Sequence, residues 1–215
     1  NGDEMYESVS GQTRMFQTTY NSGDWHGDLQ SFKVDTTTGE VVTNAPVWSA
    51  EEKLVTTLGT NGTGHVNRKI ATYNGSKGIP FRWDTDATTE LTALQRKQLA
   101  PYFIESTTTP LTGKDVVNYL RGNKTSETSN TTYSTAYREF RSRGATHPLG
   151  DIINSLARYQ DEVLYVGSND GMLHAFRATD TGGGEELFAY VPNHAFRKLR
   201  ELADPAYDHR YFVDN

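Results

Sequence analysis

The sequence contains no cysteine, which excludes disulfide bonds, thiolate metal ligands and cysteine nucleophiles. It also has no apolar run long enough to form a membrane-spanning helix, so we expect no membrane insertion. A basic excess is missing as well: 27 acidic against 21 basic residues give a net charge of −6, which disfavours a nucleic-acid partner. Aromatic residues are plentiful, and 12 Tyr, 9 Phe and 3 Trp indicate a folded chain rather than a disordered one.

The sequence also lacks the common catalytic motifs. There is no Gly-x-Ser-x-Gly nucleophile turn and no glycine-rich phosphate loop between a strand and a helix. The six histidines show no i,i+4 pair and no carboxylate at a zinc-ligand spacing. For His26 and His174 we expect half-buried, hydrogen-bonded side chains. We therefore predict no catalytic residues and no bound metal.

One acidic segment deserves comparison with calcium loops. Asp84, Asp86 and Glu90 place oxygen atoms at alternate positions, as calcium ligands are placed. The segment lacks the central glycine and the twelve-residue frame of such loops. Asp and Thr directly before a helix are also ordinary caps. These three residues are weak metal candidates, and we favour the capping interpretation.

The clearest organising feature is an internal repeat. Gly27, Leu29 and Phe32 recur at constant spacing as Gly171, Leu173 and Phe176. The repeat positions that we expect to have a structural role are Trp25, Gly27, Leu29, Phe32, Gly39, Gly171, Leu173, Phe176 and Gly184. Each copy predicts three antiparallel strands. In the first they are 15–20, a strand with Leu29 and Phe32, and 40–48; in the second they are 163–166, a strand with Leu173 and Phe176, and 186–191. Such a meander forms most of a propeller blade, although two unrelated hairpins with similar turns are the alternative.

Other elements lie between and after the repeat copies. Residues 69–83 predict a further hairpin around an Asn-Gly turn. Helices are expected near 89–99, 113–121 and 194–203, the last capped by Asn193. A strand is expected over 137–143, where Arg141 and Arg143 would share a face and pair with local acidic residues rather than with an acidic partner.

Two polar loops are the candidate binding surfaces. Residues 58–67 and 123–135 are rich in Thr, Ser, Asn and Gly, and we expect both to be exposed and the second to be mobile. The weak candidates for contact with a partner are Gly59, Asn61, Asn123, Thr125 and Asn130. Loops on a rigid scaffold commonly carry recognition. The alternative is that both loops are spacers without a partner.

Several segments, taken together, resemble one family. The strongest are Leu149–Ser155, Leu164–Phe176, Glu185–Pro192 and His209–Asp214, and the weaker are Ser22–Leu29, Val47–Ala50, Phe81–Trp83 and Tyr119–Gly122. In this order they are similar to the C-terminal propeller domain of the PilC/PilY proteins of type IV pili. The resemblance implies a mainly β fold: antiparallel meanders of a partial, modified β-propeller with a few short helices. Residues 1–215 would form one region, the N-terminal blades of the propeller, with a helix and loop insertion around 84–135. We expect the sequence to be a piece of a longer protein.

The resemblance also implies a function. A protein of this family would be non-enzymatic, exported through the periplasm and outer membrane, and found at the tip of the pilus on the cell surface. It would act with minor pilins in pilus extension and retraction, and hence in twitching motility and adhesion to host or abiotic surfaces. The family carries a calcium loop of the form Asp-x-Asp-x-Asp in a later blade. That loop has no counterpart in this sequence, so we expect no cofactor here.

Two other functions remain open. The repeat is similar to the blades of quinone-cofactor (PQQ) dehydrogenases, which contain Asp-Gly-x-Leu-x-Ala-Phe and Thr-Gly-Glu segments. The absence of cysteine and of a repeated blade tryptophan disfavours this enzyme class. The other alternative is a propeller scaffold of the cell envelope that is unconnected with pili.

Overall fold

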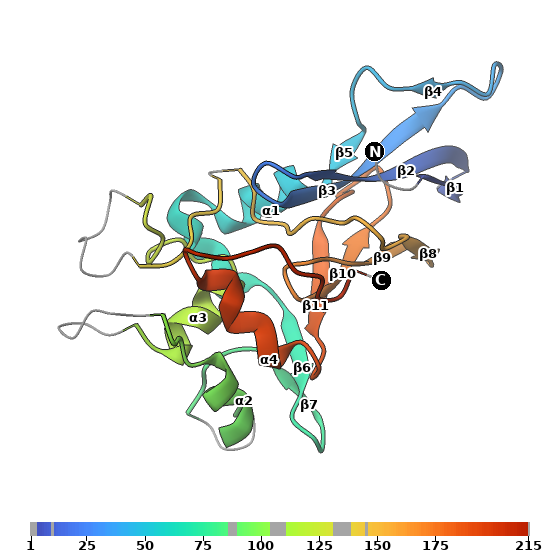
Figure 1. The fold of residues 1–215 in the computed structure, drawn as a ribbon. Helices are drawn as coiled ribbons and strands as arrows, with labels where there is room; N and C mark the ends of the chain where they lie inside the picture. The colour runs from blue at the N-terminus through green and yellow to red at the C-terminus, as the bar shows by residue number, and fades with distance from the viewer. Residues whose placement is uncertain are drawn as a thin grey trace.

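The computed structural model describes residues 4–9, 11–85, 90–103, 111–130, 139–144 and 146–214. Strands dominate them and form two sheets, while short helices gather beside the second sheet (Figure 1). The predicted fold class, mainly β and compatible with a partial propeller-like arrangement, is confirmed. None of the helices in these ranges is long and apolar enough to cross a membrane.

The first sheet is built from the N-terminal part of the chain and has five strands. They are β1 (Glu4–Val9), β2 (Gln12–Asn21), β3 (His26–Val34), β4 (Val41–Val42) and β5 (Trp48–Ser49). β1, β2, β3 and β4 lie in chain order, and β5 pairs with another part of β3. The long β2–β3 hairpin is the predicted start of the first repeat copy.

The second sheet has six strands in the order β7-β6-β11-β10-β9-β8. Their bounds are β6 (Ile70–Tyr73), β7 (Gly78–Pro80), β8 (Arg158–Gln160), β9 (Val163–Gly167), β10 (Leu173–Arg177) and β11 (Glu186–Val191). β9, β10 and β11 form the predicted meander of the second copy, and β6 with β7 forms the predicted hairpin.

One pairing departs from the expected antiparallel pattern. β6 lies parallel to β11, with Ile70 opposite Ala189 and Thr72 opposite Val191. The Thr72 hydroxyl adds a hydrogen bond of 2.7 Å to the carbonyl of Val191. The hairpin that precedes the insertion therefore extends the sheet of the second repeat copy.

The predicted strand over 40–48 is mostly wrong. Only Val41–Val42 and Trp48–Ser49 are extended, and the chain then enters helix α1 (Ala50–Leu58), which was not predicted. The Ser49 hydroxyl caps this helix by accepting the amide of Glu52 at 3.1 Å. The third strand of the first copy is thus replaced by two short strands and a helix.

The remaining helices agree more closely with expectation. α2 (Ala93–Leu99) begins later than predicted, after Thr92, whose hydroxyl and backbone form a capping box with Gln95; residues 86–89 lie outside the described ranges. α3 (Gly113–Leu120) is confirmed.

The predicted C-terminal helix is a short α4 (Phe196–Leu199) followed by the 3₁₀ turn η3 (Arg200–Ala203). Asn193 does not cap it, because its side-chain oxygen instead accepts a bond from Gln95. Another 3₁₀ segment, η1 (Thr60–Asn67), follows α1.

The predicted strand over 137–143 is also wrong where it can be examined. Within 139–144 only Phe140 makes a β-bridge, to Glu127. Residues 137 and 138 lie outside the described ranges. The pairing expected for Arg143 is nevertheless present, because its Nε lies 2.8 Å from Oε1 of Glu127. Arg141 instead donates to the carbonyl of Leu202 and lies over the ring of Tyr207.

The two glycines aligned in the repeat act differently. Gly27 lies inside β3, where an added Cβ would come within 2.7 Å of the carbonyl oxygen of Gly150. Gly171 lies in a turn with φ of +90°, a conformation that favours glycine. Of the other turn glycines, Gly39 and Gly184 also have positive φ. Leu29, Phe32 and Phe176 are buried as expected, whereas Leu173 is half-buried.

Two buried clusters hold these layers together. One lies among the first sheet, α1 and part of the second sheet, and includes Phe16, Leu29, Trp48, Leu164 and Phe176. The other packs α2, α3 and α4 on the β6–β11 side of the second sheet, around Phe81, Val116, Phe140 and Phe196. Trp48 also meets the second repeat copy, because a Cβ added at Gly183 would lie 2.1 Å from its indole ring.

Replacing Trp48 by alanine tests this packing. The indole packs against Phe16, with 5.7 Å between ring centroids and 34° between ring planes, and it also contacts Gly183. Its loss should therefore lower the free energy of unfolding by about 3–5 kcal/mol. Urea denaturation of the two proteins measures the difference. Val66→Ala, at a side chain that is 66% exposed, should change stability by less than about 0.5 kcal/mol. Equal stability of Trp48→Ala and wild type would contradict the assigned core.

Candidate functional site

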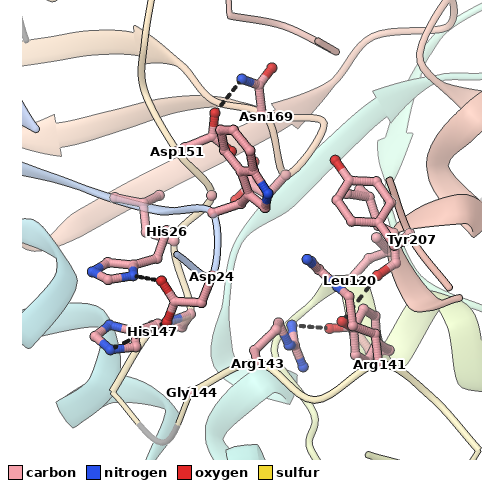
Figure 2. Close-up of a pocket in the computed structure, with 17 residues that line it drawn as sticks. Asp24, His26, Leu120, Arg141, Arg143, Gly144, His147, Asp151, Asn169 and Tyr207 are labelled. Carbon is pink, nitrogen blue, oxygen red and sulfur yellow. Dashed lines mark hydrogen bonds and ion pairs between the residues drawn. The ribbon is translucent and has the colours of Figure 1, made fainter. Parts of the chain in front are cut away.

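A small cavity lies where several loops meet, between the two sheets and the end of α3 (Figure 2). Its walls come from the β2–β3 turn, residues 141–151, the turn at 169–170, and Leu202 with Tyr207. The cavity volume is about 30 Å³, which is room for one or two water molecules. Charged and imidazole side chains surround it, so the site is suited to small polar groups.

The β2–β3 turn supplies two of these side chains. The amide of Trp25 donates to the carbonyl of Asn21 at 3.0 Å, and Trp25 has a φ of 58°. This tight turn places Asp24 and His26 side by side, with 2.5 Å between Asp24 Oδ1 and His26 Nδ1. The role found for Trp25 is therefore to form the turn and to stack on His209, 3.8 Å between ring centroids.

His147 joins this turn from a distant part of the chain. Its ring stacks on that of His26 with 3.6 Å between centroids and 14° between planes. Its Nε2 lies 3.8 Å from Asp24 Oδ2, and its Nδ1 lies 3.0 Å from Oε1 of Glu51 at the start of α1. Figure 2 shows the two imidazoles and Asp24 turned toward one another. We name Asp24, His26, His147 and Glu51 the histidine–carboxylate cluster.

Burial and charge shift the protonation of this cluster. Burial, together with the charges of Asp28, Asp24 and Glu52, raises the pKa of Glu51 to about 8. Burial lowers the pKa of His147, and the neighbouring His26 adds to the effect. Burial therefore favours the neutral form of the His147 ring near neutral pH.

A second polar network lies on the opposite wall of the cavity. The amide nitrogen of Asn169 donates to Asp151 at 2.7 Å and to Asp214 at 3.1 Å. The oxygen of Asp151 that accepts from Asn169, Oδ2, also lies 2.8 Å from Nε2 of His209. Burial raises the pKa of Asp151, although its hydrogen bonds with Asn169 and His209 oppose this shift. Asp214 also accepts the backbone amides of residues 153–155, at 2.6–3.0 Å. The network therefore joins three of the segments that carry the family resemblance: 149–155, 164–176 and 209–214.

A third group of charges lies inside the second sheet. Arg68 makes two bonds to Glu186, of 2.7 and 2.6 Å, and Glu186 also lies 2.8 Å from Nδ1 of His174. The other ring nitrogen of His174 lies 3.1 Å from Asp170. Burial alone would lower the pKa of His174, but these two carboxylates outweigh it and raise the pKa to about 9. His174 is thus fully buried and ion-paired, not half-buried as predicted, whereas His26 is half-buried.

The predicted metal candidates do not contribute to the cavity. Asp84 accepts a bond of 2.9 Å from Nε of Arg82, and Glu90 pairs with Arg96. Asp86 lies outside the described residues. Asp84 and Glu90, which both precede α2, therefore each pair with an arginine.

The expectation of two independent exposed loops is wrong over 123–130. The amide of Asn130 donates to Asn61 at 3.2 Å and to the carbonyl of Lys124 at 2.8 Å, so the two polar loops are packed against each other. Asn123 and Thr125 are half-buried and bond to one another, Asn130 is buried, and Gly59 is exposed. Residues 131–135 lie outside the described ranges. Contact of these loops with a partner stays a prediction.

The cluster was not found from the sequence, because its members are far apart in the chain. Spacing rules detect ligands that lie on one helix or hairpin. Only Asp24 and His26 are close in sequence, and a two-residue spacing carries little information. Trp25, His26 and Gly27 lie at the start of a repeat copy, but only Gly27 recurs in the second copy, and these positions were assigned to structure alone.

Comparisons with known proteins agree with the resemblance found in the sequence. The chain is 29% identical over 228 residues to the type IV pilus biogenesis factor PilY1 homolog of Xylella fastidiosa, a match that covers 93% of the chain and 15% of the relative. It is 30% identical over 234 residues to PilY1 of Pseudomonas aeruginosa strain PAK, covering 93% of the chain and 18% of the relative. The chain thus spans less than a fifth of the length of these relatives. No family model and no solved structure matched.

We name Arg68, Glu186, His174 and Asp170 the buried ion group. This group predicts that the protein loses stability at alkaline pH. Because the pKa of His174 is raised from 6.5 to about 9, its stabilising contribution is complete below about pH 6.5 and is lost as the pH rises through about 9. The free energy of unfolding should fall by up to about 3 kcal/mol across this window. Urea denaturation from pH 6 to pH 9.5 measures the change.

Two variants identify the group responsible. His174→Gln keeps a hydrogen-bonding side chain without a titrating ring, so its stability should depend less on pH than that of the wild type. His194→Gln, at an exposed residue, should keep the full dependence. An identical pH profile in wild type and His174→Gln would show that another group causes the loss.

Proposed function

Because nearly the whole chain is a PilY1-type sequence, we propose that it forms part of a type IV pilus biogenesis factor of the bacterial cell envelope. The observation that carries this proposal is the similarity over 93% of the chain to proteins of that name from two bacterial genera. We further propose that the protein is exported and lies at the tip of the pilus. There the domain would act with minor pilins in extension and retraction.

The physical role that we propose is that of a rigid, non-enzymatic scaffold. Three features support it: two sheets that share a core through Trp48, a buried ion group, and loops fixed by the Asp214 carboxylate. The cavity admits groups of about the size of water, far below the several hundred Å³ of a typical substrate site. A domain that transmits force or presents a binding surface needs such rigidity. Adhesion to host or abiotic surfaces would use the loops outside this frame.

A deletion experiment tests the biogenesis role. Removing the coding region for residues 1–215 should abolish surface pili and twitching, because the scaffold that presents the contact with minor pilins would be lost. Sheared surface pilin on an immunoblot and the diameter of the twitching zone are the readouts. Total cellular pilin should stay unchanged, and expression of the intact gene should restore both readouts. Normal surface pilin in the deletion strain would contradict the proposal.

The enzyme alternative has its own test. The purified chain, mixed with pyrroloquinoline quinone and Ca²⁺, should give no alcohol-dependent reduction of an electron-acceptor dye above the rate of the free cofactor. The same mixture with a known quinoprotein dehydrogenase serves as the positive control. Saturable, alcohol-dependent dye reduction by the chain would contradict the non-enzymatic role while leaving the deletion result to stand by itself.

A further inference from the structure

The backbone brings two distant segments into contact beside the cavity. The amide of Gly27 donates to the carbonyl of Leu149 at 3.3 Å, and His26 and Gly150 form a β-bridge. This approach requires glycine at position 27, because a Cβ would lie 2.7 Å from the carbonyl oxygen of Gly150. The contact fixes the β2–β3 turn against the loop that carries His147. The positions of both imidazoles are therefore set by the fold.

Three side chains bring atoms that could bind a metal close together. One ligand atom each from Asp24, His26 and His147 lies within 4.8 Å of the others. In tetrahedral zinc sites, bonds of 2.0–2.1 Å place neighbouring ligand atoms about 3.3 Å apart. To reach that geometry, the two stacked rings must tilt apart, and the ligand atoms must approach one another by about 1–1.5 Å. Their exposed fractions of 17% and 28%, and 43% for Asp24, leave the side chains room to move.

Glu51 completes the arrangement behind His147. Its carboxyl group lies 3.0 Å from Nδ1, while Nε2 lies 3.8 Å from Asp24 and 3.4 Å from the Thr146 hydroxyl. Metal-binding histidines usually donate their second ring N–H to a carboxylate in this way.

We propose that Asp24, His26 and His147 bind one divalent transition-metal ion of the zinc type, with Glu51 as the positioning residue for His147. Two imidazoles and one carboxylate suit Zn²⁺ and its neighbours, whereas Ca²⁺ and Mg²⁺ prefer oxygen ligands alone. The cavity beside the cluster has room for a water molecule as fourth ligand. Such an ion would join the first sheet, α1 and the 144–150 loop at one point.

Calorimetric titration of the metal-free 215-residue chain with Zn²⁺ tests the proposal. We expect one ion per chain, and visible absorption bands of tetrahedral type when Co²⁺ replaces Zn²⁺. His147→Gln and Asp24→Asn should weaken Zn²⁺ binding at least about 100-fold, and Glu51→Ala about 10–100-fold, because it removes only the positioning contact. His194→Gln removes an exposed histidine outside the cluster and should bind Zn²⁺ as the wild type does.

Three outcomes would overturn the site. They are the absence of saturable one-to-one binding, equal affinity of His147→Gln and wild type, and tighter binding of Ca²⁺ than of Zn²⁺. Any of these would rule out a zinc-type site in the cluster. Near-ultraviolet circular dichroism checks that each variant is folded. If His147→Gln is unfolded, Glu51→Ala and the Co²⁺ spectrum decide the question. Neither readout depends on pilus assembly, so the site and the biogenesis role fail separately.

Discussion

The burial of the Arg68 guanidinium constrains the centre of the molecule more than any other single feature. A buried charge without a partner costs several kcal/mol, so the fold must bring a carboxylate to it. Glu186 supplies that carboxylate from β11, and Arg68 also donates to the carbonyl of Arg121 at the end of α3, at 3.0 Å. Glu186 in turn holds His174, which reaches Asp170. Two cations and two anions from separate segments are thus balanced, and none can be placed without the others.

Ion pairs and hydrogen bonds also fix the loops around the cavity. Glu127 pairs with Arg143, whose remaining nitrogens donate to the carbonyls of Tyr119 and Asn123 at 2.8 Å. Asp214 holds the backbone of residues 153–155 on the other side. Loops are usually the least restrained parts of a protein. Here their backbone groups are bonded to buried side chains, so the cavity has the rigidity of the sheets next to it.

The sequence predicted the strands well where apolar residues alternate and turns are marked by glycine. β11 was predicted to the residue, and the hairpins of both repeat copies were found. Helix α1 was missed because only Leu54 and Leu58 form its apolar stripe and two threonines lower its helix propensity; its stability comes from packing on the sheet. The polar 123–130 segment was taken as exposed because composition does not reveal that Asn130 satisfies its amide on the other loop. The histidine–carboxylate cluster depends on long-range pairing of segments, which no local spacing encodes.

The parallel pairing of β6 with β11 also determines when the fold can be completed. Thr72 and Val191, which are bonded across this pair, are separated by 119 residues. During synthesis, one edge of β6 therefore stays open until the chain has been made as far as Val191. Open strand edges pair readily with other chains, and pairings of such long range form slowly. A factor that covers this edge until β11 arrives would prevent aggregation of the incomplete chain.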